Sequence, residues 1–284
     1  MPVPTLLIFG MGYSAAVIAA RLRHAGWTVI GTSRSPRPGM IGFDDAAAVE
    51  AAMADASHIL SSVPPDEATR GDPVLLRHHA TLAQNGKWLG YLSSTGVYGD
   101  SGGAWVDESA PLGGRRAGRL AADQAWLAIG ARVFRLPGIY GPGRSALERV
   151  ASGTAHCIDL PGQVFSRVHV NDIASGVIAG LDGPPGAYNL ADDAPCSQNA
   201  VIEFACALLG VPPPPLRPID DAGLSPMARA FYAENRRVAN GRAKRVLGWQ
   251  PAFADYRAGL RALSAMNSPA IASAAPAAAS HDQR

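Results

Sequence analysis

The feature that most constrains this chain is a strand, a glycine turn and a helix over residues 5–22. The apolar run Thr5–Phe9 is typical of a buried parallel strand, and Val17–Leu22 has the apolar spacing of a helix. Between them stands the pattern Gly10-x-Gly12-x-x-Ala15. In such a junction the first glycine permits a tight turn, the second leaves room for a pyrophosphate, and the small third residue keeps the helix close to the sheet. The pattern therefore predicts a dinucleotide-binding site, with the free N–H groups at the helix start facing the phosphates.

The same residues admit two other interpretations. Residues 12–16, Gly-Tyr-Ser-Ala-Ala, resemble the nucleophile turn of hydrolases, but that turn follows a central strand with several strands before it. Only one predicted strand precedes Ser14, and no His-Gly-Gly-Gly-type segment accompanies it, so we set hydrolysis aside. A structural turn without a ligand is the other alternative. The residues expected to contact the dinucleotide are Gly10, Gly12, Tyr13, Ser14 and Ala15.

The second predicted strand, Trp27–Thr32, carries the signal for the kind of dinucleotide. An NAD site places Asp or Glu at the end of this strand, where it accepts a hydrogen bond from the ribose 2′-hydroxyl. Here Ser33 and Arg34 stand at that point, with Arg37 close behind. No acid follows before Asp44. A hydroxyl and a guanidinium suit the charge and geometry of a 2′-phosphate, so the sequence favours NADP over NAD. An exposed arginine in a proline-rich loop is the alternative.

Two further apolar runs end in polar or turn residues, as strands do at the carboxyl edge of a parallel sheet. The run Ala56–Val63 stops at Pro64-Pro65, because proline cannot donate to a strand ladder. The run Trp88–Leu92 leads into Ser, Thr and Gly residues. Ligands of α/β proteins bind in the crevice at this edge. We therefore expect the cofactor site to include Ser62, Val63 and Pro64.

Residues 93–99, Ser-Ser-Thr-Gly-Val-Tyr-Gly, closely resemble the Ser-Ser-x-x-Val-Tyr-Gly signature of extended short-chain dehydrogenases/reductases, the NAD(P)-dependent epimerase/dehydratase group. Further segments resemble motifs of the same family, namely Val106–Pro111, Arg135–Arg144, Arg167–Ala174, Tyr188–Leu190 and Leu247–Pro251. The resemblance extends from Thr5 to about Leu263. It implies an α/β fold with a Rossmann-type doubly wound parallel sheet and a smaller C-terminal substrate lobe. It also implies that Ser94 binds the substrate and that Ser93 and Pro137 contact the cofactor.

The chain departs from this family at the residues that move protons. Members use a Ser together with a Tyr-x-x-x-Lys pair, because the lysine lowers the pKa of a tyrosine that otherwise titrates near ~10. The chain has seven tyrosines, and lysine follows none of them at the fourth position. In the register of the resemblance, Arg115 stands at the tyrosine position and Arg119 at the lysine position. Arginine cannot donate a proton near neutral pH, so the ordinary mechanism does not carry over.

The candidate catalytic residues are Ser94, Tyr98 and Arg119. Ser94 would bind a substrate oxygen, and Arg119 would lie at the nicotinamide ribose. A displaced tyrosine, Tyr98 or Tyr140, would supply the proton. Both tyrosines have an alternative role as packing residues of the family motifs.

Composition limits the partners of the chain. Its 25 Lys+Arg against 23 Asp+Glu give a net charge of +2, too small to indicate nucleic acid or an acidic membrane surface. We expect a small-molecule substrate, which would be anionic if Arg115, Arg116 and Arg119 form a clamp rather than a solvated helix start. No apolar run is long enough for a membrane span, and three widely spaced cysteines fit reduced thiols rather than a metal site. We therefore expect a soluble, cytoplasmic protein without a metal.

Residues 1–137 are expected to form the dinucleotide-binding domain, and residues 138–263 a mixed α/β substrate lobe from which 171–190 return to the first domain. Residues 264–284, rich in Ala, Ser and Pro, are expected to be disordered. Two functions stay open. One is an oxidoreductase or epimerase that acts on a small or nucleotide-linked carbonyl or hydroxyl substrate. The other is a non-catalytic NADP(H)-binding redox sensor or regulatory protein, which the missing Tyr-x-x-x-Lys pair favours.

Overall fold

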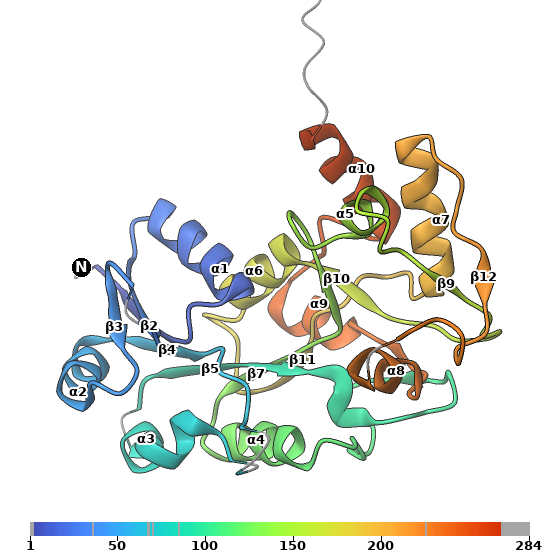
Figure 1. The fold of residues 1–284 in the computed structure, drawn as a ribbon. Helices are drawn as coiled ribbons and strands as arrows, with labels where there is room; N and C mark the ends of the chain where they lie inside the picture. The colour runs from blue at the N-terminus through green and yellow to red at the C-terminus, as the bar shows by residue number, and fades with distance from the viewer. Residues whose placement is uncertain are drawn as a thin grey trace, which may run out of the picture.

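The computed structural model describes residues 3–35, 37–66, 69, 71–84, 86–224 and 226–267. A sheet of seven parallel strands runs through its centre (Figure 1), in the order β3-β2-β1-β4-β5-β7-β11. These strands are β1 (Thr5–Phe9), β2 (Thr28–Ser33), β3 (Met40–Gly42), β4 (His58–Ser61), β5 (Trp88–Ser94), β7 (Arg132–Leu136) and β11 (Gly186–Asn189). From β1 the chain builds outward to β3, then crosses back and builds the other half from β4 onward. The predicted Rossmann-type doubly wound α/β fold is confirmed.

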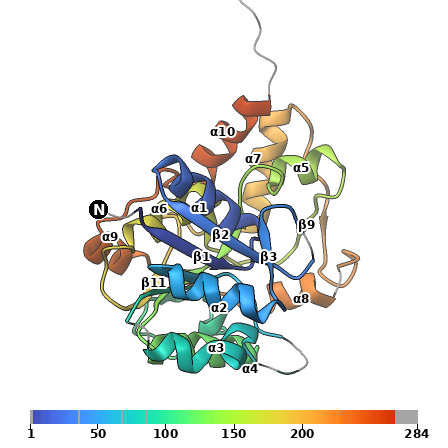
Figure 2. The same ribbon diagram turned by 90° about the vertical axis from the view of Figure 1, so that its left-hand side faces the viewer.

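Strand β1 shows how the sequence builds both faces of the sheet, because successive side chains of a strand point to opposite sides. Leu6 and Ile8 are buried in one apolar cluster and Leu7 and Phe9 in another. The first cluster includes residues of α1 (Tyr13–His24), α6 (Val170–Ala179) and α9 (Gly241–Leu247). The second includes residues of α2 (Ala46–Asp55), α3 (Pro73–Gln84) and α4 (Ala117–Ala128). Figure 2 shows the resulting layers, with α1 above the sheet and α2, α3 and α4 below it.

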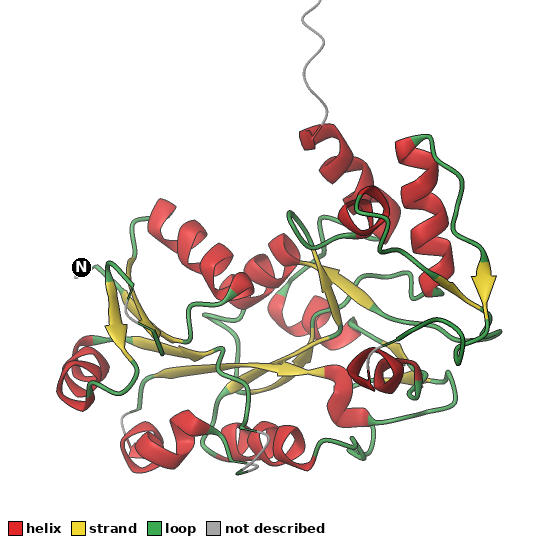
Figure 3. Ribbon diagram, in the orientation of Figure 1, coloured by secondary structure: helices red, strands yellow, loops and turns green. Residues whose placement is uncertain are grey.

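The C-terminal lobe lies on the right in Figure 3. Two parallel strand pairs belong to it, β8 (Gly138–Tyr140) with β10 (Arg167–His169) and β9 (Cys157–Ile158) with β12 (Leu216–Arg217). Helices α5 (Ala146–Ala151), α7 (Gln198–Leu209) and α10 (Tyr256–Asn267) share one apolar cluster, and α8 (Pro226–Tyr232) packs beside a smaller one. Within the residues described here, no helix has the length and apolar character needed to cross a membrane.

Later segments of the chain return to the Rossmann part. Helix α6 lies against α1, and β11 forms the outer strand beside β7. Strand β13 (Arg237–Val238) pairs in parallel with β6 (Trp105–Val106). After α9, the buried Trp249 donates through Nε1 to the Asp172 carbonyl at 3.2 Å. Residues 241–249, expected in the substrate lobe, thus pack on the Rossmann part, and the division of the chain at residue 137 stays a prediction.

The predicted start of the tail at Ser264 is wrong, because α10 continues to Asn267. Leu260 and Leu263, three residues apart on one helix face, are buried in the apolar cluster of the lobe and hold the helix against it. The rest of the predicted tail, 268–284, lies outside the described residues.

Candidate cofactor and substrate site

Strand β1 ends in the tight turn that the glycine pattern predicts. Gly10 has a φ of +81°, a left-handed conformation that favours glycine. The neighbouring strand β2 fixes this turn, since Gly10 N donates to Thr32 Oγ1 and Met11 N to the Thr32 carbonyl, both at 3.1 Å. A Cβ on Gly10 would lie 3.0 Å from Val63 Cγ2. The turn therefore brings together the ends of β1, β2 and β4.

The start of α1 is open. Gly12 is the N-cap residue, and no side chain caps the helix. Gly12 is exposed, and a Cβ added to it would meet no atom within 4 Å. Ser14 and Ala15 are buried, so they can offer a ligand only their backbone. A pyrophosphate needs an uncapped helix start with free space beside it, so the residues present fit a dinucleotide.

The end of β2 presents a guanidinium. The strand ends at Ser33, and Arg34 follows as an exposed residue. Among the described residues, none hydrogen-bonds or pairs with the Arg34 side chain. The first acid beyond this point, Asp44, pairs instead with Arg77, with an Nη1–Oδ1 distance of 2.7 Å. The strand end therefore offers a cation where an NAD site offers a carboxylate.

The loops after the central strands meet at the same edge of the sheet. After β4, Ser62 N donates to the Phe9 carbonyl at 2.8 Å, and the exposed Pro64 comes two residues later. After β7, Pro137 is half-buried. Ser94, the last residue of β5, is paired in register with Leu136, next to Pro137. The predicted cofactor residues thus lie at the ends of adjacent parallel strands.

Ser93 and Ser94 have different surroundings. Ser93 is buried, and its hydroxyl donates to Asp123 Oδ2 at 2.6 Å. Ser94 is half-buried and caps the short helix η1 (Thr95–Tyr98), since its Oγ accepts from Gly96 N at 3.1 Å. The Ser94 hydroxyl keeps its own proton available for a ligand.

A buried ion pair connects α4 to the carboxyl ends of β5 and β7. Arg135 of β7 binds Asp123 of α4 through two bonds, Nη2–Oδ1 at 2.7 Å and Nε–Oδ2 at 3.1 Å. Both side chains are at most 2% exposed. The pair also holds the Ser93 hydroxyl, so the ends of β5 and β7 are fixed to one helix. Such a forked geometry satisfies two buried charges at once.

The proposed proton donor Tyr98 is engaged inside the fold. Its hydroxyl donates to Asn189 Oδ1 at 2.8 Å and accepts from Arg135 Nη1 at 3.0 Å. The side chain is buried, and burial raises the pKa of Tyr98. The hydroxyl has one proton and donates it within this network, and the role of Tyr98 as a proton donor stays a prediction. Tyr140 is also buried, and burial raises its pKa.

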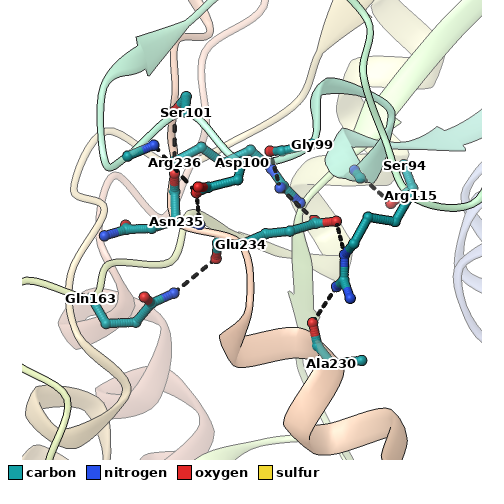
Figure 4. A network of polar contacts seen from close by, with 12 residues as sticks. Ser94, Gly99, Asp100, Ser101, Arg115, Gln163, Ala230, Glu234, Asn235 and Arg236 are labelled. Carbon is teal, nitrogen blue, oxygen red and sulfur yellow. Dashed lines mark hydrogen bonds and ion pairs between the residues drawn. The ribbon is translucent and has the colours of Figure 1, made fainter.

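Arg115 lies beside the Ser94 turn and is held by the lobe. The N–H groups of Gly113 and Gly114 both donate to the Val97 carbonyl, at 3.0 and 2.9 Å, which places the next residue against η1. Arg115 Nε binds Glu234 Oε1 at 2.8 Å, and its Nη2 donates to the Ala230 carbonyl (Figure 4). These two partners belong to residues 226–236, which we call the strap.

The strap has further bonds to the same edge of the sheet. Arg236 Nη1 binds Glu234 Oε2 at 2.6 Å and the Gly99 carbonyl at 2.5 Å (Figure 4). Asn235 N donates to Asp100 Oδ1 at 2.8 Å. Burial alone would raise the pKa of Glu234, but the hydrogen bonds from both arginines hold it below its ordinary value. The strap is therefore bound to the loop that follows η1.

Arg119 lies inside α4, one turn beyond Arg115, and is half-buried. Its guanidinium lies near Tyr91, where burial raises the tyrosine pKa and the positive charge of Arg119 opposes that shift. Arg115 and Arg119 stand at the tyrosine and lysine positions of the resemblance. Their surroundings differ, because Arg115 precedes α4 and Arg119 belongs to it.

No protein-family model matches the chain. A structure of a functionally unknown conserved protein from Silicibacter pomeroyi is 43% identical, with a TM-score of 0.82, over 93% of this chain and 99% of that one. The chain belongs to the same family as that protein.

Proteins that are less similar in sequence share the fold of this chain. A Bacillus anthracis dTDP-glucose 4,6-dehydratase in complex with NAD is 16% identical, with a TM-score of 0.76, over 93% of this chain and 96% of that one. A human epimerase family protein with NADPH is 19% identical, with a TM-score of 0.71, over 92% and 99%. These structural neighbours are NAD-dependent epimerase/dehydratase family members.

A curated relative matches only part of the chain. It is a 3-diazoavenalumate denitrifying reductase from a Streptomyces species, 29% identical over 140 residues, which are 45% of this chain and 45% of that protein. The match thus spans less than half the length of that relative.

Sequence reasoning missed the residues that hold the site together. Thr32 lies in a predicted strand, and nothing in the pattern marks its hydroxyl as the partner of Gly10 N. Glu234 lies 119 residues from Arg115 in a segment without any recognised motif. Arg135 does belong to a motif of the resemblance, and the opposite charges of Asp123 and Arg135 are the one signal that could have paired them.

Proposed function

We propose that the chain is an NADP(H)-dependent oxidoreductase whose active site uses Ser94 and nearby arginines in place of a Tyr-Lys pair. The observation that carries the proposal is the open, uncapped helix start at Gly12, with Arg34 at the end of the neighbouring strand. Two further findings support it: a structural neighbour is solved with NADPH, and a partial relative is named a reductase.

The cofactor would lie along the ends of β1, β2 and β4. The backbone from Gly10 to Ala15 would bind the pyrophosphate, and Ser33 and Arg34 would bind the 2′-phosphate. The remaining contacts would come from Ser62, Val63, Pro64, Ser93 and Pro137. Bound NADPH supplies a hydride, which is two electrons and one proton, to an electron-poor atom of the substrate.

The chain's own residues would then manage the charge that hydride transfer creates. The Ser94 hydroxyl would donate a hydrogen bond to the substrate oxygen. The guanidinium of Arg115, fixed beside η1 by Glu234, would stabilise negative charge that develops there, and Arg119 would hold the nicotinamide ribose. Tyr98 uses its proton inside the fold, so we assign the final proton to water entering the crevice.

A second function is favoured by one observation. The chain lacks the Tyr-x-x-x-Lys pair, and a protein that only senses the redox state of NADP(H) would need the cofactor site without a proton donor. Such a sensor would bind the cofactor and release it unchanged.

The experiment is NADPH binding by fluorescence, followed by turnover assays against nucleotide sugars and small carbonyl compounds. The control variant is Ser109→Ala, since Ser109 is exposed and is not one of the proposed cofactor or substrate contacts. Binding with turnover that Ser94→Ala abolishes and Ser109→Ala retains supports the enzyme. Binding without turnover favours the sensor. Absence of NADPH binding contradicts both functions.

A further inference from the structure

A cavity of about 470 Å³ lies in the C-terminal lobe, bordered by β8, α5, α7 and α10. It adjoins the edge of the sheet, since Gly138 in its wall is two residues beyond Leu136, the register partner of Ser94. The cavity also lies next to the glycine turn, because Tyr13 Oη donates to the carbonyl of Pro142, beside the cavity residue Gly143, at 2.9 Å. None of the proposed cofactor contacts lies in the wall of this cavity, so the cavity can hold a second ligand.

Three arginines and one glutamate line the cavity. The arginines differ in the partners that the fold gives to their guanidinium groups. Arg167 is used by the fold, with its Nη1 donating to the Phe165 carbonyl at 2.9 Å and its Nη2 to Gln198 Oε1 at 3.1 Å. Arg144 lies over the Tyr13 ring, 5.8 Å from its centre. Arg149 interacts with a like charge on Arg167 and an opposite charge on Glu148, and no described residue hydrogen-bonds its guanidinium. Among the described residues, neither Arg144 nor Arg149 has a hydrogen-bond acceptor or an ion pair, and Arg149 also lacks the ring contact that Arg144 makes.

An aromatic surface forms another part of the wall. The rings of Phe165 and Phe231 are stacked, with centroids 4.6 Å apart and planes within 8°. Phe231 is 52% exposed although it is a large apolar residue. A planar ring placed on its free face would bury that surface and extend the stack.

The start of α5, which borders the cavity, is closed to phosphate. Ser145 Oγ accepts from Leu147 N at 3.1 Å, and the Glu148 carboxylate accepts from Ser145 N at 2.7 Å and Gly143 N at 3.1 Å. The N–H groups that would bind a phosphate are thus taken, and the Glu148 charge repels one. A ligand with a single negative charge meets less of this repulsion than a phosphate does and still offers a partner to Arg149.

We propose that the cavity binds an aromatic carboxylate, with Arg149 on the carboxylate and Phe231 against the ring. The assignment names the substrate class and so rests on the proposed function, since the cavity adjoins the edge of the sheet at which Ser94 lies. Recognition combines a charge-assisted hydrogen bond with ring stacking, and a neutral or non-planar ligand loses one of the two.

The test is calorimetric binding of trans-cinnamate to the full chain, with and without saturating NADPH. Cinnamyl alcohol removes the charge, cyclohexanecarboxylate removes the planar ring, and UDP offers a ring with two phosphates. The variants are Arg149→Gln and Arg149→Lys, and Arg217→Gln is the matched control on an exposed arginine outside the cavity wall.

We expect cinnamate to bind, Arg149→Gln to weaken it at least tenfold, Arg149→Lys to recover part of that loss, and Arg217→Gln to change nothing. Both cinnamate analogues should bind more weakly than cinnamate. No cinnamate binding, equal binding by Arg149→Gln, or tighter binding of UDP than of cinnamate would overturn the proposal. NADPH binding is measured on the same samples, so a failed cofactor site with intact cinnamate binding contradicts the proposed function alone.

Discussion

Arg115 and Glu234, 119 residues apart in the sequence, form an ion pair with an Nε–Oε1 distance of 2.8 Å. Glu234 is 12% exposed and also binds Arg236, so one carboxylate joins the loop before α4 to the strap. The contact fixes the guanidinium that the proposed mechanism places beside Ser94. The ion pair also holds the Arg115 side chain in one orientation, although this side chain is half exposed.

Replacing Glu234 tests the strap. Glu234→Ala leaves Arg236 half-buried without its carboxylate, which we expect to destabilise the protein by about 1–3 kcal/mol. Limited proteolysis should then cut within 226–236 faster than in the parent protein. Asp44→Ala is the control, because Asp44 pairs with Arg77 at an exposed site outside the strap. Equal cutting of both variants would show that Glu234 does not restrain the strap.

The choice of cofactor depends on Arg34. Arg34→Ala should weaken NADPH binding by about 10- to 100-fold, the effect of one or two charge-assisted hydrogen bonds, and leave NADH binding nearly unchanged. Titration of both nucleotides by fluorescence measures this. Arg37→Ala is compared in parallel, and an equal loss in that variant would assign the 2′-phosphate to the loop rather than to Arg34.

Substitutions of the two glycines in the turn should affect different properties, the NADPH affinity at Gly12 and the stability at Gly10. Gly12→Val adds a side chain to open space at a negative φ, so we expect an unchanged Tm and a large loss of NADPH affinity. Gly10→Val forces a left-handed conformation and a contact with Val63, so we expect a loss of about 1–3 kcal/mol of stability. Thermal unfolding and NADPH titration of both variants check this pair. Normal NADPH binding by Gly12→Val would place the pyrophosphate elsewhere.

Loss of the buried Asp123–Arg135 ion pair should lower the stability more than loss of an exposed ion pair. Asp123→Ala leaves the Arg135 guanidinium buried without a counter-charge, which costs about 3–5 kcal/mol. Asp44→Ala removes the exposed pair with Arg77 and should cost at most about 1 kcal/mol. Chemical denaturation of the two variants measures the difference. Similar values for both would mean that the burial of the Asp123 pair adds nothing.

We expect the stability of the protein to depend on pH through Asp192. Burial raises the pKa of this carboxyl to about 7, and its Oδ2 has no partner among the described residues. Between the ordinary Asp pKa of ~4 and 7, the folded state holds a proton that the unfolded state has lost, so stability falls as pH rises through this range. Asp192→Asn should remove this fall and stabilise the protein at pH 8 by on the order of 1 kcal/mol. Unfolding curves at pH 5 and pH 8 compare the two proteins, and an unchanged pH slope in the variant would contradict the assignment.

The sequence predicted the parts of this molecule that depend on local pattern. The junction at Gly10 and Gly12 could be predicted because a tight turn restricts both the residue types and their spacing. Ser33, Ser62 and Ser94, which lie at or directly after the ends of their strands, could be placed together because parallel strands end at one edge. These rules need no knowledge of distant contacts.

The parts that could not be predicted depend on long-range packing. Nothing local in Tyr98 indicates that Arg135 and Asn189 occupy its hydroxyl. The position of Trp249 on α6, rather than in the lobe, follows from a hydrogen bond across 77 residues. Charge and hydrophobicity identify such residues as polar or apolar, but only the folded chain selects their partners.

The hydrogen bond from Tyr13 to the Pro142 carbonyl connects the first turn of α1 to the loop that leads into α5. A dinucleotide that orders this turn would also restrain the loop beside the lobe cavity, which lowers the entropy that a second ligand must lose on binding. Thermodynamic linkage makes the effect mutual, so each ligand would raise the affinity for the other. One tyrosine hydroxyl would thereby impose positive cooperativity between the nucleotide and the ligand of the lobe cavity.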